Sequence, residues 1–276
     1  MFSRKTQGIA QLYAERHHAG WGLREEKPYG NYGYWTREGM TLVEAQDAMA
    51  ELVARAAGVS PGDRVLEVGC GYGAAAVHYT RLFSPSAVTG LDVTDVRIEQ
   101  GGGYVAKNGL ADRIRLQLGD ATKLDFPNGS FERVIGIECA LHFNTRVDFL
   151  REAARVLTPG GGLGLADILL RKGADPEAYI REVHFPIGSD GSLDVPENVY
   201  DEDVYADHLR ASGFDNPKIE SITAKTLPHL ISHLDRLAIE TPDERGARRK
   251  LAAKIYQRYL DLGLEYVLVS ARRVGA

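Results

Sequence analysis

Apolar residues recur along this chain with two different periods, and the order of those periods predicts its fold. Residues 42–56 place apolar side chains at helical spacing up to Gly58, and a turn follows at 60–63. After that turn, short apolar runs typical of buried strands alternate with helical segments. The strands are expected at 64–68, 87–91, 114–118, 133–137 and 163–169, and the helices at 74–83, 94–108 and 147–157.

This alternation predicts an α/β fold, a Rossmann-like doubly wound and mainly parallel sheet with helices on both faces. Ligands of such sheets bind beyond the carboxyl ends of the strands, so the residues directly after each strand are the candidates for a site. The glycine-rich stretch 159–162 is expected to interrupt the chain before the fifth strand.

Four segments are expected from these patterns. Residues 1–58 start with a short helix and an aromatic-rich loop, and we expect them to form a cap. Residues 59–170 form the alternating core. The proline-containing stretch 171–200 is too long for an ordinary connection and is interpreted as a lid. Residues 201–276 complete the sheet, with helices at 201–212 and within 227–262, interrupted at 241–242, and strands at 219–223 and 264–270.

Composition excludes several classes of protein. The net charge is −5 and neither sign forms a long run, which argues against nucleic acid as a partner. The first residues lack a signal-peptide core and no stretch is apolar for long enough to cross a bilayer, so a cytoplasmic location is expected. The two cysteines, Cys70 and Cys139, have no partner at metal-ligand spacing, so we expect neither a metal nor a disulfide.

A glycine-rich loop follows the first predicted strand. Gly69, Gly71 and Gly73 permit a tight turn and let a ligand approach backbone N–H groups where a helix begins. Gly69 and Gly71 with Ala74 also satisfy the dinucleotide fingerprint, and Asp92 follows at a suitable distance to bind a ribose hydroxyl. On the glycines alone, an NAD-dependent oxidoreductase remains a possible interpretation.

Glu67, two residues before the first glycine of this loop, distinguishes between the two candidate cofactors. Its carboxylate would repel a bound pyrophosphate and attract a cation. S-adenosylmethionine carries a sulfonium, an ammonium and two ribose hydroxyls, and it has no phosphate. Asp92 and the Gly119-Asp120-Ala121 sequence supply two further acidic strand ends. Three acidic strand ends favour S-adenosylmethionine.

The stretch 60–170 resembles the class I S-adenosylmethionine methyltransferases, through Glu67 with the three glycines, Asp92, Asp120 and the sequence 155–161. The resemblance implies that Asp92 holds the ribose, that Asp120 lies near the adenine amine and that the glycine loop borders the methionine moiety. The cofactor-binding residues expected on this basis are Tyr34, Glu67, Gly69, Cys70, Gly71, Gly73, Asp92, Val93, Gly119, Asp120, Ala121 and Glu138.

Two shorter segments, 32–35 and 138–143, are similar to bacterial natural-product methyltransferases of the sugar O-methylating type. The resemblance implies that the first segment helps to cover the cofactor and that His142 and Asp167 serve base chemistry. A positioned base adds about 10²–10⁴-fold to such a proton transfer. Two plainer interpretations stay open, namely that His142 only caps a loop and that Asp167, which lies in an apolar strand, only has a structural partner.

The sequence therefore predicts methyl transfer from S-adenosylmethionine to O, N or C of a small natural-product acceptor, with His142 as the general base. The alternative from another class is a cofactor-binding protein that promotes cyclisation or isomerisation without methyl transfer. The acceptor, the methylated atom and the oligomeric state, possibly a homo-oligomer, are not fixed by any motif.

Overall fold

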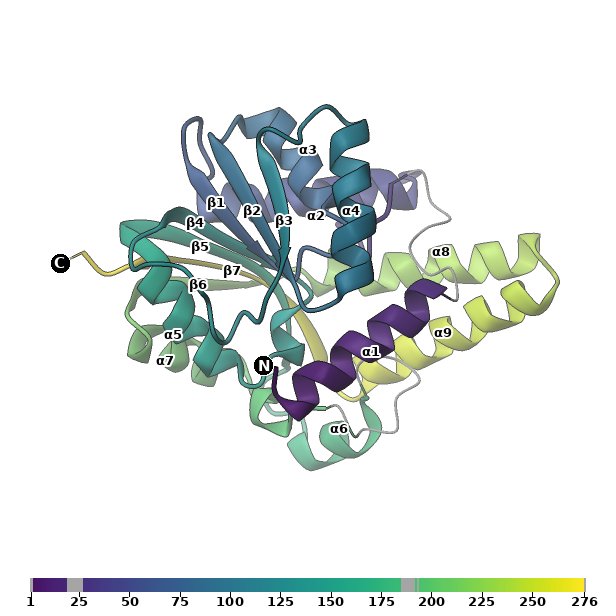
Figure 1. Ribbon diagram of the computed structural model, residues 1–276. Helices are drawn as coiled ribbons and strands as arrows, with labels where there is room; N and C mark the ends of the chain where they lie inside the picture. The colour runs from purple at the N-terminus through teal and green to yellow at the C-terminus, as the bar shows by residue number, and fades with distance from the viewer. Residues whose placement is uncertain (1, 19–26, 185–191, 193, 276) are drawn as a thin grey trace.

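The fold is described from a computed structural model, which describes residues 2–18, 27–184, 192 and 194–275. Its described residues form one seven-stranded sheet in the order β3-β2-β1-β4-β5-β7-β6 (Figure 1). The pairs that join β3, β2, β1, β4 and β5 are parallel, whereas β7 runs antiparallel to both β5 and β6. The strands are β1 (Arg64–Val68), β2 (Ala87–Asp92), β3 (Ile114–Leu118), β4 (Phe131–Ile137), β5 (Leu157–Leu170), β6 (Phe214–Ser221) and β7 (Leu264–Arg273). The predicted Rossmann-like, mainly parallel sheet is confirmed.

Helices cover both faces of the sheet. On one face α2 contacts β5 and α3, and α3 contacts α4, while α5 and α7 contact each other on the other face. The hairpin of α8 and α9 projects from the body of the molecule, and α1 lies beside α4 (Figure 1). The helices are α1 (Arg4–His18), α2 (Leu42–Ala57), α3 (Ala74–Phe83), α4 (Asp95–Lys107), α5 (Arg146–Val156), α6 (Pro176–Glu182), α7 (Glu202–Ala211), α8 (Leu227–Glu240) and α9 (Glu244–Asp261).

Most predicted elements coincide with observed ones, and the largest differences in bounds lie at the starts of β5 and β6. Helix α6 falls within the predicted lid, where no helix was expected. The glycine-rich stretch 159–162 was expected to precede β5, but β5 already begins at Leu157, because Leu157 pairs with Phe131 of β4. Likewise β6 begins at Phe214 and not at 219. A shift in its register between Asp215 and Lys218, with Asn216 at a positive φ of 44°, hides this strand from the alternation pattern.

The contact between α2 and β5 depends on small residues. A Cβ atom added at Gly162 would lie 2.0 Å from the carbonyl oxygen of Ala57, and one added at Gly164 would lie 2.6 Å from that of Val53. Only glycine allows the helix backbone to come this close to the strand. Residues 42–57 of the predicted cap therefore belong to the helical layer on the sheet.

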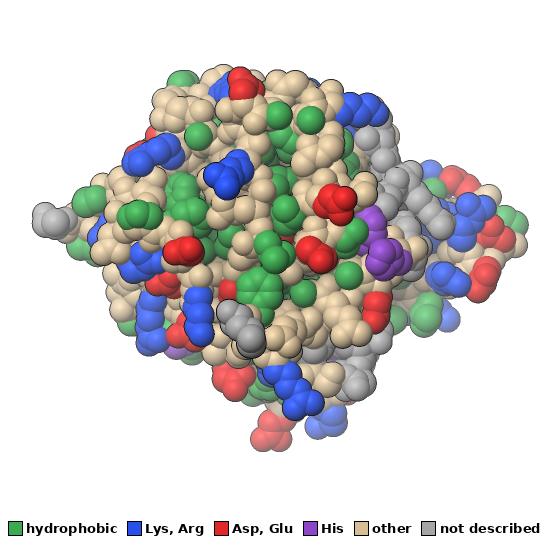
Figure 2. All heavy atoms as spheres, in the orientation of Figure 1, with side chains coloured by type: hydrophobic (Ala, Val, Ile, Leu, Met, Phe, Trp, Pro, Cys, Tyr) green, Lys and Arg blue, Asp and Glu red, His purple; other side chains and the backbone are tan. Residues whose placement is uncertain are grey.

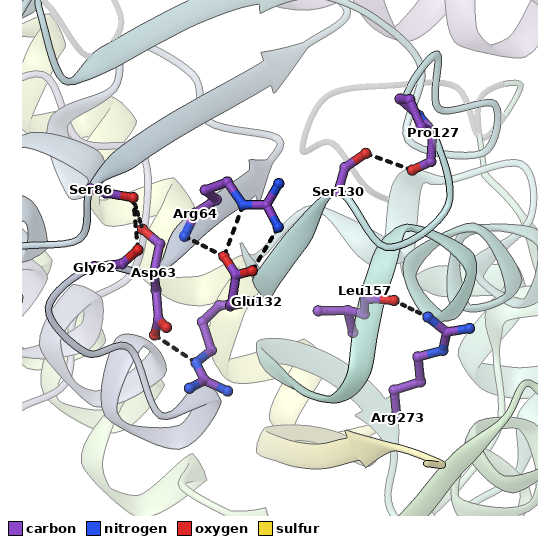
Figure 3. A network of polar contacts seen from close by, with 10 residues as sticks. Gly62, Asp63, Arg64, Ser86, Pro127, Ser130, Glu132, Leu157 and Arg273 are labelled. Atoms are coloured by element: carbon purple, nitrogen blue, oxygen red, sulfur yellow. Dashed lines mark hydrogen bonds and ion pairs between the residues drawn. The ribbon is translucent and has the colours of Figure 1, made fainter. Parts of the chain in front are cut away.

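The amino ends of the central strands are tied together by polar contacts (Figure 3). Arg64 at the start of β1 pairs with Glu132 in β4 at 2.7 Å. Beside it, Asp63 pairs with Arg133 at 2.8 Å, and the Ser86 hydroxyl donates to the Asp63 carbonyl oxygen at 3.1 Å. These contacts fix one edge of the sheet and leave the carboxyl ends of the strands free to form a site.

The surface view is consistent with the charge pattern of the sequence. Figure 2 shows acidic and basic side chains interspersed over one face of the molecule. In the described part of the chain, no helix is long and apolar enough to cross a membrane. The same residues contain no group of three or more His, Cys, Asp or Glu side chains suited to a metal ion.

Candidate active site

A cavity of about 380 Å³ lies at the carboxyl ends of the parallel strands. This is the size range of small-molecule sites. Its walls come from α1, the loop 28–32, the glycine loop, the ends of β2, β3 and β4, and the α8–α9 hairpin. The predicted site residues that line it are Glu67, Gly69, Cys70, Gly71, Asp92, Val93, Gly119, Asp120, Ala121, Glu138 and His142.

Three predicted site residues, Tyr34, Gly73 and Asp167, are not among the described residues that line the cavity. The Tyr34 hydroxyl instead lies 3.3 Å from the Lys225 ammonium, and Tyr32 takes the place beside the cavity. Residues two apart share a face in a regular extended segment, but Gly33 between the two tyrosines has a φ of 82°, which breaks that regularity. Gly73 is the N-cap of α3, with a φ of 75°, and so forms the end of the glycine loop where that helix begins.

The glycine loop is held in a conformation that other residues rarely adopt. Gly69, Gly71 and Gly73 all have positive φ values, of 64°, 54° and 75°. A Cβ atom on Gly69 would lie 2.4 Å from that of Cys139, so Cys139 packs directly beneath the loop. The loop is further fixed by the Gly71 N–H, which donates to Asp92 Oδ2 at 2.9 Å.

Glu67 lies under the glycine loop with 3% of its surface exposed. Its Oε2 atom accepts a hydrogen bond from the Tyr79 hydroxyl at 3.0 Å. The pKa of this carboxyl is raised to about 8, chiefly by burial and in part by the charge of Asp92, against a lowering by the Tyr79 hydrogen bond. A buried carboxyl that faces a cavity, with no cation beside it among the described residues, favours a positively charged ligand.

The two other acidic strand ends are oriented by the backbone. Asp92 accepts from the N–H groups of Gly71 and Thr94, each at 2.9 Å. Asp120 Oδ1 accepts from the Thr122 N–H at 2.9 Å, and its Oδ2 accepts from the Thr6 hydroxyl of α1 at 3.2 Å. Both carboxylates are thus fixed at the rim of the cavity with defined orientations.

Glu138 follows β4 and adopts a positive φ of 53°, an unusual conformation for a residue with a side chain. Its Oε1 accepts from the Tyr32 N–H at 2.7 Å and from the Tyr266 hydroxyl at 2.5 Å. Burial raises the pKa of Glu138 to about 8, while both hydrogen bonds lower it. The site therefore holds two cavity-lining carboxyls that carry a proton near neutral pH.

His142 ends the short turn after β4 and lines the cavity. Its Nε2 lies 3.2 Å from the Tyr13 hydroxyl of α1. The pKa of His142 is lowered to about 3, chiefly by burial and in part by the positive charges of Arg16, Arg97 and Arg146. The imidazole is therefore neutral at physiological pH and retains a lone pair.

Asp167 lies elsewhere, in the middle of β5, with no exposed surface. Its Oδ2 lies 2.9 Å from Arg146 Nε and accepts from the Tyr205 hydroxyl at 2.9 Å, while Oδ1 accepts from Arg146 at 3.2 Å. Arg146 is equally buried and needs an anion beside it. The structure thus pairs Asp167 with Arg146, as the plainer interpretation had it, and not with His142.

Several cavity residues were missed in the sequence. One face of α1 contributes Thr6, Ile9, Tyr13 and Arg16, whose spacing of three to four residues is the signal that identifies the face of a helix. Arg97 of α4 also lines the cavity, with its guanidinium 4.1 Å from the centre of the Tyr13 ring. No motif pointed to these residues.

The fold and site together define a class. Acidic residues end β1, β2 and β3 around a glycine loop, which suits a cationic nucleoside cofactor better than a dinucleotide. Residues 65–161 match the family model described as a methyltransferase domain. The chain belongs to the class I S-adenosylmethionine-dependent methyltransferases, which sets aside the NAD interpretation.

Relatives extend the similarity beyond that domain. The chain is 31% identical to erythromycin 3''-O-methyltransferase of Saccharopolyspora erythraea, over 96% of this chain and 89% of the relative. It is 32% identical to 27-O-demethylrifamycin SV methyltransferase of Amycolatopsis mediterranei, over 72% of this chain and 71% of the relative. Among solved structures, the (4+2)-cyclase SpnF shares the fold with a TM-score of 0.76 and 23% identity, over 98% of this chain and 97% of that one.

Proposed function

We propose that this enzyme methylates a hydroxyl group of a small natural product, with S-adenosylmethionine as the methyl donor. The observation that carries the proposal is the similarity to an O-methyltransferase over 96% of the chain. That share of the chain reaches well beyond the matched domain, outside which the α8–α9 hairpin forms a wall of the cavity. The relative is named for methylation of an oxygen of erythromycin, and a comparable acceptor is the first to test.

The residues at the strand ends fit this cofactor. Glu67 and the glycine loop would border its methionine moiety, Asp92 would hold the ribose hydroxyls and Asp120 would lie near the adenine. The raised pKa of Glu67 supports the assignment, because a buried carboxyl of this kind gains a charge partner only when a cation binds. When bound, the cofactor supplies an electrophilic methyl group on sulfur.

The other part of the cavity suits an apolar acceptor. Its wall contains side chains from the turn after β4 and from the helical hairpin: Leu141, Phe143, Leu230, Leu234 and Ala252. Such a wall excludes water and holds the acceptor oxygen in line with the methyl group. Alignment of this type supplies about 7–11 kcal/mol of the barrier reduction in well-oriented reactions.

His142 is the proposed proton acceptor, and Tyr13 orients its ring. A pKa of about 3 makes His142 a weak base for an alcohol. As the O–CH₃ bond forms, however, the attacking oxygen becomes an oxonium ion, whose proton is far more acidic than that of an alcohol. A neutral imidazole of low basicity is therefore sufficient, provided that it lies within hydrogen-bonding reach.

Calorimetry combined with turnover tests the proposal. S-adenosylhomocysteine should bind the protein, and Glu67→Ala should weaken that binding, while NADH should bind neither. Macrolide and other polyketide aglycones and glycosides, supplied with S-adenosylmethionine labelled in its methyl group, should yield an O-methylated product. Conversion of an acceptor while the cofactor stays unconsumed would instead establish the cyclising or isomerising alternative.

A further inference from the structure

The turn that carries His142 is a thin partition between two cavities. Leu141 and His142 line the main cavity of about 380 Å³ on one side. The same two residues line a second cavity of about 50 Å³ on the other side, next to Val195 and Asn198. A segment that borders a cavity on both faces has fewer packing neighbours than a core residue normally has. Hydrogen bonds therefore make a larger contribution to its position.

Asn198 supplies those bonds from a distant part of the chain. Its side-chain amide donates to the carbonyl oxygens of Leu141 at 3.0 Å and Phe143 at 2.8 Å, and a longer contact of 3.4 Å reaches that of Ala140. These residues surround His142 in the turn. Asn198 is 5% exposed, so water does not compete for these bonds.

Asn198 is itself fixed by Arg146, the first residue of α5. The Arg146 N–H donates to Asn198 Oδ1 at 2.9 Å, and its guanidinium donates to the Asn198 carbonyl oxygen at 2.7 Å. The guanidinium also donates to the Ile168 carbonyl oxygen at 3.0 Å and pairs with Asp167. Every polar atom of the Asn198 side chain therefore has a partner, and the chain of contacts leads back to β5.

We propose that Asn198 is a positioning residue that sets the place and the environment of His142. The inference rests on the proposed function only where it concerns turnover. Loss of the amide frees three carbonyl groups of the turn, which then seek water. The turn moves into one of its two cavities, and water reaches the imidazole. Asp167, predicted as a catalytic residue, takes part in this arrangement through Arg146 and has no direct contact with the cavity.

Titration of His142 measures this effect without an acceptor. The groups that face His142 are Tyr13 and Arg16 of α1, Arg97 of α4 and Arg146 of α5. All four side chains are kept in Asn198→Ala, and the one contact among them that is lost is the acceptor of the Arg146 backbone N–H. With ¹³C-labelled histidine and His142→Asn to assign the signal, the wild-type resonance should not titrate above pH 5. In Asn198→Ala the midpoint should rise by more than about one unit, because hydration restores the charged form.

Turnover and cofactor binding complete the test. In Asn198→Ala, kcat should fall about 10²-fold, the cost of a misplaced catalytic group. The Kd for S-adenosylhomocysteine should change less than about twofold, because Asn198 is not among the described residues lining the main cavity. Glu197→Gln, an exposed neighbour, is the matched control and should leave the titration, kcat and Kd unchanged.

A second variant protects the test against misfolding. Asn198→Asp keeps the oxygen that accepts from the Arg146 backbone N–H, but its second oxygen presents an acceptor to the carbonyl groups of the turn. It should fold and should raise the midpoint as Asn198→Ala does, with a further rise from its own negative charge. If the midpoint is unchanged in either folded variant, the positioning role is wrong. If it shifts while kcat is unchanged, positioning is supported and the base role proposed for His142 fails.

Discussion

The Tyr79 hydroxyl donates a hydrogen bond to Glu67 across 3.0 Å, in a region where both side chains are almost fully buried. Tyr79 lies on α3 and Glu67 on β1, so the bond joins the helix after the glycine loop to the strand before it. The neutral Tyr79 hydroxyl is the hydrogen-bond partner of this buried carboxyl when no cation is bound beside it. This pairing makes the protonation state of Glu67 sensitive to what the cavity contains.

Binding of S-adenosylmethionine should therefore release a proton from Glu67. The pKa of about 8 means that the carboxyl is mostly protonated at pH 7, whereas a cation beside it favours the carboxylate. Affinity should rise with pH up to about 8 and level off above. Calorimetry in buffers with different ionisation enthalpies measures the proton directly.

Glu138 needs a matched variant in that experiment, because its pKa is also raised to about 8 and it lines the same cavity. Glu67→Gln should abolish most of the proton release, and Glu138→Gln should abolish less of it. Proton release that is unchanged in Glu67→Gln would contradict the assignment of Glu67 to the cofactor cation.

Replacement of His142 separates chemistry from binding. His142→Ala should lower kcat by about 10²–10⁴-fold, the usual contribution of a positioned base, and should leave S-adenosylhomocysteine binding nearly unchanged. Tyr13→Phe removes only the hydroxyl 3.2 Å from Nε2 and should give a smaller loss. Equal turnover in His142→Ala and the wild type would show that the acceptor loses its proton to another group.

The pair formed by Arg146 and Asp167 should dominate the stability of this region. Both side chains are fully buried, so Arg146→Met leaves an unpaired carboxyl and should cost about 3–5 kcal/mol of the free energy of unfolding. Arg146→Met combined with Asp167→Leu should cost less than Arg146→Met alone. Urea denaturation of the variants measures both values, and a larger loss in the double variant would contradict this account.

Glycine at position 162 should be required for packing and not for flexibility. Gly162→Ala places a methyl group 2.0 Å from the Ala57 carbonyl oxygen, so α2 must move away from β5, at a cost of about 1–3 kcal/mol. Gly102→Ala, on the exposed side of α4 with nothing within 4 Å, should instead stabilise the protein by about 0.5–1 kcal/mol. Thermal unfolding of the two variants should shift in opposite directions.

The elements of the core could be predicted from the sequence because each follows a local rule. The alternation of apolar periods predicted β1, β3 and α3 with their observed bounds. The three closely spaced glycines predicted the tight turn of the glycine loop. The acids at the strand ends, Glu67, Asp92 and Asp120, follow from the rule that parallel strands end at one edge. Each of these signals lies within a few residues of the feature that it predicts.

The contacts that complete the site depend on tertiary structure instead. Nothing near Tyr13 in the sequence indicates that it meets His142, which lies 129 positions away. The partner of Asp167 could not be predicted for the same reason. A carboxylate in an apolar strand indicates that a partner is needed, but it does not indicate which residue that partner is. Asn198 lies in a segment without periodicity, and only the fold shows that its amide reaches the turn after β4.

The reversed direction of β7 has a consequence for how this enzyme can change. Since β6 ends and β7 begins at the edge of the sheet where the cofactor site lies, the whole α8–α9 hairpin is a single connection between neighbouring strands. Two neighbouring antiparallel strands need only a short turn to connect them. The proposed acceptor wall can therefore be lengthened, shortened or exchanged in evolution or in the laboratory without any change to the strands whose ends form the proposed cofactor site.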